Sequence, residues 1–332
     1  MKRVFIHIGM HKTASTYIQQ SLQSNRALLR RHFLYFDNGI NNRLKTAVSK
    51  RKFSPWKEQL LAAERCGCDL LVSHEAFSHL LASDVKSSSF ASRGGWLAGM
   101  LQDCEYEIVL IAFIRDQPDY LNSQYVQHIK NFSISASFEE YAVSMMGHTK
   151  NRGECDPCRL FGWIMADSHL QSRFIPFGID RDNDPFRQFL SALGVDPDLG
   201  WRKRRPSNLQ LGRLATETAL LVSILLKESN LPCSGKKDRK LLSDLLKRSG
   251  HRLGWSKERF KGLTPVMYEA IRSHYRDAND RFACAVWGVG SWSDLFPERV
   301  PKIVTPLNSW QLWLVQQNAE YLVRKFQRSR SD

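Results

Sequence analysis

Several short segments of this chain are apolar at almost every position, and segments with a helical pattern separate them. The apolar segments are RVFIHI (3–8), FLYF (33–36), DLLVS (69–73) and EIVLIAFIR (107–115), and SRFIPF (172–177) forms a further candidate strand. A strand that is apolar throughout is buried on both faces, and strands that alternate with helices form parallel sheets. The sequence therefore predicts an α/β fold in which helices cover both faces of a parallel sheet.

The second part of the chain has a different pattern. From about residue 207 the apolar spacing is mostly helical, and the basic stretch WRKRR (201–205) marks the join. We therefore expect an α/β core over 1–206 and a helical C-terminal region over 207–332, packed together as a single domain. The most apolar long segment, LATETALLVSILL (214–226), is interrupted by Thr, Glu and Thr at 216–218, so we expect a buried amphipathic helix there.

The chain is strongly basic. It has 48 Lys and Arg against 33 Asp and Glu, a formal net charge of +15. Such a charge suits an anionic ligand: a phosphorylated cofactor, an acidic glycan, a nucleic acid or an anionic membrane surface. The basic residues are spread along the chain, with one dense cluster at 202–205, and this distribution disfavours a nucleic-acid-binding face.

The cysteines show no disulfide framework. There are seven, an odd number, at irregular spacing. A reducing, cytoplasmic location is therefore the expectation. Cys155 and Cys158 form a single C-x-x-C without a second pair or a His at zinc spacing, so we expect no metal site.

The first strand runs into the loop GMHKTAST (9–16), which has the composition of an anion site. Gly9 permits close approach of the backbone, Lys12 supplies a positive charge, and Thr13, Ser15 and Thr16 supply hydroxyl donors at the start of a helix. The nucleotide P-loop, G-x-x-x-x-G-K-[ST], is longer and has a second Gly. The shorter loop disfavours triphosphate hydrolysis, and a P-loop-like kinase or NTPase that uses ATP and Mg²⁺ remains the alternative.

Two motifs together resemble the sulfotransferase family, most closely its bacterial and carbohydrate-type branch. HIGMHKTASTYIQQSL (7–22) is similar to the 5′-phosphosulfate loop, G-x-x-K-[ST]-G-[ST]-[ST], with Ala14 where Gly is usual. Ala fits this position without strain if its φ angle is negative. Arg115 and Ser123, eight residues apart, match the spacing of the 3′-phosphate site, although Gln117 interrupts the usual R-D-P.

The resemblance implies a P-loop-NTPase-like sheet and transfer of a sulfuryl group from 3′-phosphoadenosine 5′-phosphosulfate (PAPS) to an acceptor hydroxyl, without a metal. It implies that Lys12 acts at the point of transfer and that the loop holds the cofactor, through Gly9, His11, Lys12, Thr13, Ala14, Ser15 and Thr16. His11 would contact the sulfate or the acceptor.

The resemblance also implies a general base on the loop after DLLVS (69–73). Glu75 is the first candidate and His74 the second, the alternative for either being a polar cap on the next helix. Arg115 and Ser123 would hold the 3′-phosphate. Arg204 or Arg205 would add a cation to it, unless this basic stretch is simply a solvated face.

The acceptor is less constrained. The carbohydrate-type resemblance favours a saccharide or glycolipid hydroxyl, and the net charge is compatible with contact at an anionic membrane surface. Four tryptophans are candidate sugar-stacking platforms or helix-packing residues: Trp287, Trp292, Trp310 and Trp313.

Overall fold

The structure is a computed structural model, and it forms two compact units. It describes residues 2–35, 38–82, 92–147, 155–179, 184–202, 204, 211–231, 233, 235–255, 258–302 and 305–331. The first unit comprises Met1–Asp116, Thr149–Asn208 and Tyr275–Glu298, and the second comprises Gln117–His148, Leu209–His274 and Arg299–Asp332.

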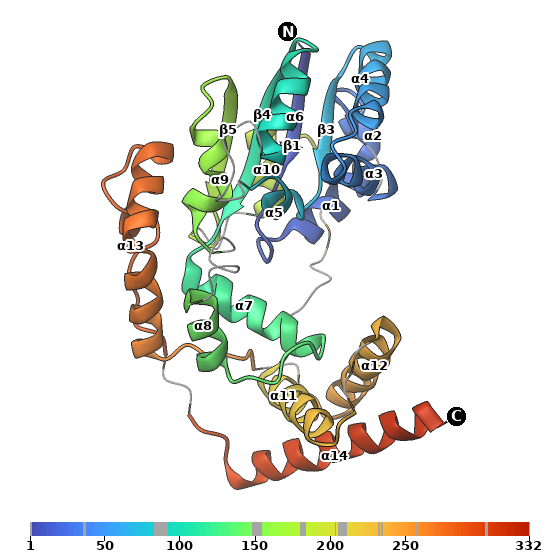
Figure 1. The fold of residues 1–332 in the computed structure, drawn as a ribbon, viewed down its shortest axis with the longest axis vertical. Coiled ribbons are helices and arrows are strands. Elements are labelled where there is room, and N and C mark those ends of the chain that lie inside the picture. Colours follow the sequence, from blue (N-terminus) through green and yellow to red (C-terminus); the bar gives the residue numbers. More distant parts are fainter. Residues whose placement is uncertain are drawn as a thin grey trace. The chain divides into compact units, whose positions relative to one another are not determined.

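A five-stranded parallel sheet lies at the centre of the first unit (Figure 1). The strands are β1 (Lys2–His7), β2 (Phe33–Tyr35), β3 (Asp69–Ser73), β4 (Tyr106–Ile114) and β5 (Leu170–Pro176), in the order β2-β3-β1-β4-β5. Strand β1 pairs with β3 on one side and β4 on the other, so that His7 lies beside both Ser73 and Ile111. The predicted parallel sheet is confirmed.

Helices cover both faces of this sheet. Helices α1 (Ser15–Ser24), α2 (Arg26–Leu29) and α10 (Pro185–Leu193) pack on the face that presents Phe5, Leu71 and Val109. Because side chains alternate along a strand, Val4 and Ile6 point to the other face. The helices on that face are α3 (Asn38–Ser49), α4 (Ser54–Cys66), α5 (Phe77–Leu81), α6 (Arg93–Gln102) and α9 (Pro157–Met165).

The end of a late helix also belongs to the first unit. Helix α13 (Pro265–Trp287) enters this unit at Tyr275 and is followed by the 3₁₀ turn η2 (Trp292–Asp294). Phe282 on α13 packs against Phe174 of β5, with ring centroids 5.2 Å apart. A helix far along the chain therefore contributes to the core beside β5.

The second unit is helical. It contains α7 (Gln117–Lys130), α8 (Phe138–Gly147), α11 (Arg213–Glu228), α12 (Lys236–Arg252), α14 (Ser309–Ser331) and the first turns of α13. Helix α11 contacts α7, α12 and α14. The expected helical C-terminal region is thus present, whereas the division of the chain at residue 206 stays a prediction. In the described parts of the chain, no helix combines the length and the apolar character needed to cross a bilayer.

Candidate functional site

The loop after β1 and the end of β4 flank a topological switch point. The chain leaves β1 for β2 on one side of the sheet and leaves β4 for β5 on the other. In open parallel sheets such a divergence opens a crevice at the carboxyl ends of the two strands, where ligands bind. Residues 8–14 follow β1 and Arg115 follows β4, so they lie at this edge of the sheet.

The backbone of the loop is tightly folded. Lys12 and Ala14 both have left-handed conformations, with φ of 65° and 63°. The condition for a relaxed Ala14, a negative φ, is therefore not met. Thr13 Oγ1 donates a hydrogen bond to the Met10 carbonyl at 2.6 Å. Turns of this kind, followed by a helix, direct backbone N–H groups to one side and favour anions there.

Arg115 is joined to the loop by a hydrogen bond. Its Nη1 donates to the Lys12 carbonyl oxygen at 2.9 Å, and its guanidinium lies over the Phe177 ring, 5.6 Å from the centroid. The next residue, Asp116, is buried and accepts a hydrogen bond from Trp292 Nε1 at 3.0 Å. The structure thus brings Lys12 and Arg115, which are 103 positions apart, to one place.

The predicted loop residues differ in exposure. Gly9, Thr13 and Ser15 are buried, whereas His11, Lys12, Ala14 and Thr16 are partly exposed. A Cβ atom on Gly9 would lie 2.8 Å from His7 Nε2 and 2.9 Å from Ser15 Oγ. Glycine is therefore required at position 9 by close contact within the first unit.

Glu75 lies beside the loop. It follows β3, the neighbour of β1, and its Oε2 is 3.7 Å from His11 Nδ1. The His11 ring in turn stacks on the His79 ring with centroids 5.0 Å apart. The hydrogen bond with His11 is the main cause that lowers the pKa of Glu75, and the charge of Lys12 adds to it. Glu75 is therefore an ionised carboxylate near neutral pH.

His74 has both ring nitrogens occupied. Its Nδ1 accepts a hydrogen bond from the Ala76 backbone N–H at 3.1 Å, at the start of α5. Nε2 must then carry the proton and donate it to Asn42 Oδ1, 2.9 Å away. Burial is the main cause that lowers the pKa of His74. In this tautomer, His74 has no lone pair available for a substrate proton.

His7 is a buried polar residue beneath the loop, and the sequence reasoning did not include it. Its Nδ1 lies 2.8 Å from Ser73 Oγ, and no described residue pairs with its Nε2, which faces Gly9. Burial lowers its pKa to about 4, so the imidazole is neutral. The signal in the sequence was a histidine inside an otherwise apolar strand, directly before the glycine loop.

Of the other three predicted phosphate-binding residues, one belongs to the second unit, one lies away from the loop, and one falls outside the described residues. Ser123 is partly buried on α7 of the second unit. Arg204 donates from Nε to Ser24 Oγ at 2.5 Å, at the C-terminal end of α1, which is about 13 Å along the helix from the loop. Arg205 falls outside the described residues.

The four candidate tryptophans fall into two pairs. In the first unit, Trp287 Nε1 donates to the Phe174 carbonyl at 2.9 Å, and Trp292 stacks on Phe296 with centroids 4.5 Å apart. These two residues pack the core. Trp310 and Trp313 are exposed on α14, and their rings stack on one another.

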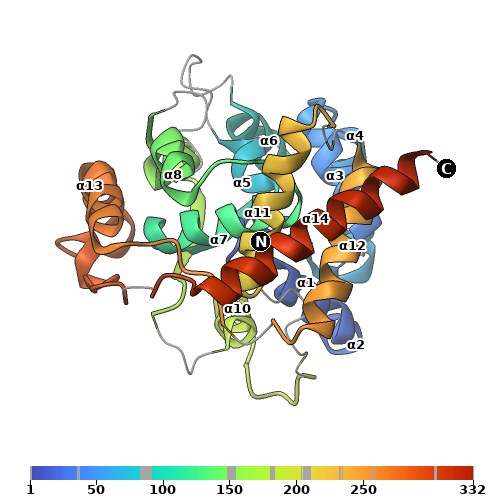
Figure 2. The same cartoon turned by 90° about the horizontal axis from the view of Figure 1, so that it is seen from below.

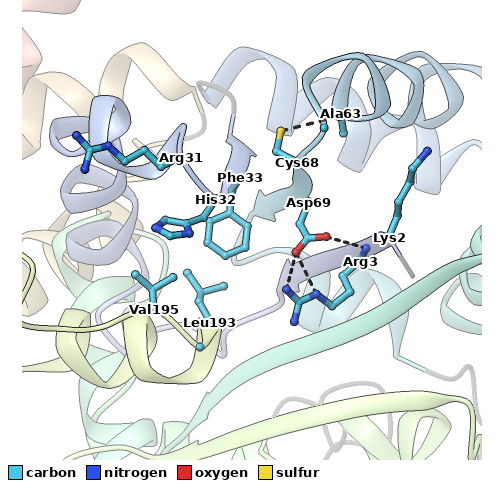
Figure 3. A pocket seen from close by; sticks show the side chains of 12 residues that line it. Lys2, Arg3, Arg31, His32, Phe33, Ala63, Cys68, Asp69, Leu193 and Val195 are labelled. Carbon is cyan, nitrogen blue, oxygen red and sulfur yellow. Dashed lines mark hydrogen bonds and ion pairs between the residues drawn. The ribbon is translucent and has the colours of Figure 1, made fainter.

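A cavity of about 410 Å³ lies at the opposite edge of the sheet, at the amino ends of β1, β2 and β3 (Figure 3). Two of its basic side chains are paired: Arg3 binds Asp69 with contacts of 2.8 and 3.0 Å, and Lys2 pairs with Glu64 at 3.1 Å. Helices α4 and α10 end at this cavity, and their C-terminal carbonyls carry partial negative charge. Arg31 also lines the cavity, which lies at the edge of the sheet opposite to the loop after β1.

The cysteines and potential metal ligands form no cluster in the described part of the chain. The seven cysteines are free thiols, and Cys158 Sγ donates to the Ala278 carbonyl at 3.1 Å. Cys155 is buried. No group of three or more His, Cys, Asp or Glu side chains among the described residues is arranged to hold a metal ion.

The geometry of the site indicates its chemistry, and comparisons with known proteins add nothing to it. No family model matches this chain, and no curated protein or solved structure matches it either. The crevice combines a tight loop, a lysine, an arginine tied to that loop and an ionised carboxylate. This arrangement can bind an anion and accept a proton next to it.

Replacing Ala14 by glycine is expected to stabilise the protein. The left-handed φ of 63° strains a residue with a Cβ atom, so Ala14→Gly should raise the free energy of unfolding by about 0.5–1 kcal/mol. Urea denaturation measures the change. Ala76→Gly is the matched control, because Ala76 has a φ of −67°, and it should lower stability instead. Equal effects of the two substitutions would contradict the strain at Ala14.

The buried His7 predicts a loss of stability in acid. Unfolded His7 binds a proton below its ordinary pKa of 6.5, whereas the folded side chain does so only near 4. The contribution of neutral His7 to the free energy of unfolding is thus fully present above pH 6.5. It is lost as the pH falls toward 4, by about 3 kcal/mol in total.

Urea midpoints measured across this pH range test the effect of His7. His7→Gln should make the urea midpoint depend less steeply on pH. Some dependence should remain, because burial also lowers the pKa of His79 to about 4. The exposed His169→Gln is the control and should leave the slope unchanged. An unaltered slope in His7→Gln would show that His7 does not titrate in this way.

Proposed function

We propose that this protein is a sulfotransferase that moves a sulfuryl group from PAPS to a hydroxyl of an acceptor, on a P-loop-like sheet. The hydrogen bond from Arg115 to the Lys12 carbonyl carries the proposal. It joins the two segments on which the sequence resemblance rests, at the crevice where an open parallel sheet binds ligands. A saccharide or glycolipid is the acceptor class that the resemblance favours, by analogy only.

The loop suits the 5′-phosphosulfate end of the cofactor. Its backbone N–H groups and the start of α1 would bind the 5′-phosphate, with the hydroxyl of Thr16 as a further donor. Thr13 and Ser15 would act through their backbone, because both hydroxyls already donate to the Met10 carbonyl. Arg115 would bind the 3′-phosphate, a group that ATP lacks. Ser123 as a second ligand of that phosphate stays a prediction from spacing.

The transfer is an in-line displacement at sulfur. The acceptor oxygen forms a bond to sulfur while the bond from sulfur to the bridging phosphate oxygen breaks, which releases adenosine 3′,5′-bisphosphate. Negative charge grows on that bridging oxygen, and the Lys12 ammonium would stabilise it. Positioning and charge stabilisation supply most of the catalysis in reactions of this type.

Glu75 is the proposed proton acceptor. It is ionised and faces His11 next to the loop, whereas the lone pair of His74 is already used by the Ala76 N–H group. The acceptor hydroxyl loses its proton to Glu75 as its oxygen attacks sulfur. His11 directly precedes Lys12 in the loop, and its ring nitrogen lies 3.7 Å from the Glu75 carboxylate, where it would orient the carboxylate.

Removal of the Lys12 charge is expected to abolish transfer. Lys12→Ala should retain at most a few per cent of wild-type activity with labelled PAPS, because the charge at the bridging oxygen is then uncompensated. Circular dichroism should show an unchanged fold. Lys50→Ala, an exposed lysine at the end of α3, is the control and should keep full activity.

Calorimetric titration without metal separates this function from a kinase or NTPase. The proposal requires that adenosine 3′,5′-bisphosphate binds and that ATP binds more weakly. Binding of ATP with Mg²⁺ and none of the bisphosphate would identify a P-loop-like kinase or NTPase instead.

The two candidate bases can be distinguished by substitution. Glu75→Gln keeps the shape of the side chain but cannot accept the proton, so kcat should fall about 10²- to 10⁴-fold. His74→Gln should cost less than about tenfold, since His74 acts only through its hydrogen bonds to Ala76 and Asn42. Steady-state kinetics of both variants decide the assignment. A larger loss in His74→Gln than in Glu75→Gln would reverse it.

A further inference from the structure

Helix α14 has an inner face that is buried and an outer face that is not. Val315, Leu322 and Phe326 are buried on the inner face, and α14 contacts α11 and α12. Figure 2 shows α14 along its whole length, with the C-terminus at its end. At 100° per residue, the outer face is formed by Trp310, Trp313, Gln317, Tyr321, Arg324 and Arg328.

The first turns of this outer face are aromatic and exposed. Trp310 is 62% exposed and Trp313 is 50% exposed, and their rings stack with centroids 4.7 Å apart and an interplanar angle of 16°. Clustered exposed apolar side chains of this size mark an interaction surface.

The second half of α14 is cationic. It carries Arg324, Lys325, Arg328 and Arg330, against a single acidic residue in the helix, Glu320. Glu320 Oε2 lies 3.8 Å from Arg324, and the Lys325 ammonium lies 6.0 Å from the centre of the Tyr321 ring. Arg330 binds Asp238 of α12 at 2.7 Å and so belongs to the packed side. The outer face therefore changes from aromatic to basic along its length.

We propose that the outer face of α14 docks this protein on an anionic lipid bilayer. Indole rings favour the boundary between headgroups and acyl chains, and arginines bind lipid phosphates, so Trp310 and Trp313 would insert while Arg324 and Arg328 meet the headgroups. The charge of +15 on the chain attracts such a surface. This proposal is independent of the sulfotransferase proposal.

A single-stranded nucleic acid fits the same face less well. Nucleic-acid grooves interleave cations with aromatic rings that stack on successive bases. On α14 the two indoles stack on each other and the cations follow them along the axis.

Vesicle sedimentation with the full chain tests the proposal. The wild-type protein should bind vesicles of phosphatidylcholine mixed with phosphatidylserine, and bind vesicles of phosphatidylcholine alone much more weakly. The double variant Trp310→Ala/Trp313→Ala should lower the partition coefficient at least about tenfold. Arg324→Gln/Arg328→Gln should also lower it and should weaken its dependence on salt.

The matched control is Val266→Ala, which removes an apolar side chain that is 77% exposed on α13, and it should bind as the wild type does. Because the four substituted side chains are exposed, thermal unfolding should show that the variants stay folded. Calorimetry with adenosine 3′,5′-bisphosphate should be unaffected by them, so the two proposals fail separately.

Three results would overturn the docking proposal. The first is an absence of binding to the anionic vesicles by the wild-type protein. The second is equal binding by the double tryptophan variant. The third is a single-stranded RNA, or a second copy of the chain detected by sedimentation velocity, that occupies the tryptophan face while vesicles do not.

Discussion

Parallel pairing of β1 with β3 and β4 is the constraint on which the candidate site depends. Lys12, Glu75 and Arg115 each follow one of these three neighbouring strands. Because the strands run in the same direction and are in register at His7, Ser73 and Ile111, their carboxyl ends lie at the same edge. The Lys12 ammonium, the Glu75 carboxylate and the Arg115 guanidinium, which are distant in sequence, therefore follow strands that end at one edge of the sheet.

The loop itself is held in a conformation that its residues do not prefer. Lys12 and Ala14 have left-handed backbones, which only glycine adopts without cost. Surrounding contacts stabilise the loop: the Thr13 hydroxyl bonds to Met10, Arg115 bonds to the Lys12 carbonyl, and Gly9 lies directly against His7 and Ser15. Strain of this kind persists where neighbouring structure over-determines it, and such places are often functional sites.

The sequence predicted the sheet well because its strands are apolar on both faces, a local pattern that needs no knowledge of distant contacts. The loop residues could also be named, since they follow a predicted strand end, whereas Glu75 was named from the resemblance to the sulfotransferases. The conformation of Ala14 could not be predicted, because one of the contacts that hold the loop, the hydrogen bond from Arg115, comes from a residue 103 positions along the chain. The partner of the His74 Nε2 proton, Asn42, lies 32 residues earlier, and the packing of Phe282 against β5 depends on a helix more than 100 residues later. Tertiary contacts of this kind leave no local pattern.

The bond from Arg115 reaches a main-chain atom of residue 12 and not its side chain. Each amino acid that tolerates the left-handed backbone at position 12 offers the same carbonyl oxygen, so among such residues the hydrogen bond to Arg115 does not depend on the charge of the side chain. A substitution at position 12 can therefore change the side chain that the loop presents while the hydrogen bond from Arg115 is kept. A protein of this kind can acquire a different reaction by a point substitution without a change in the fold of the loop.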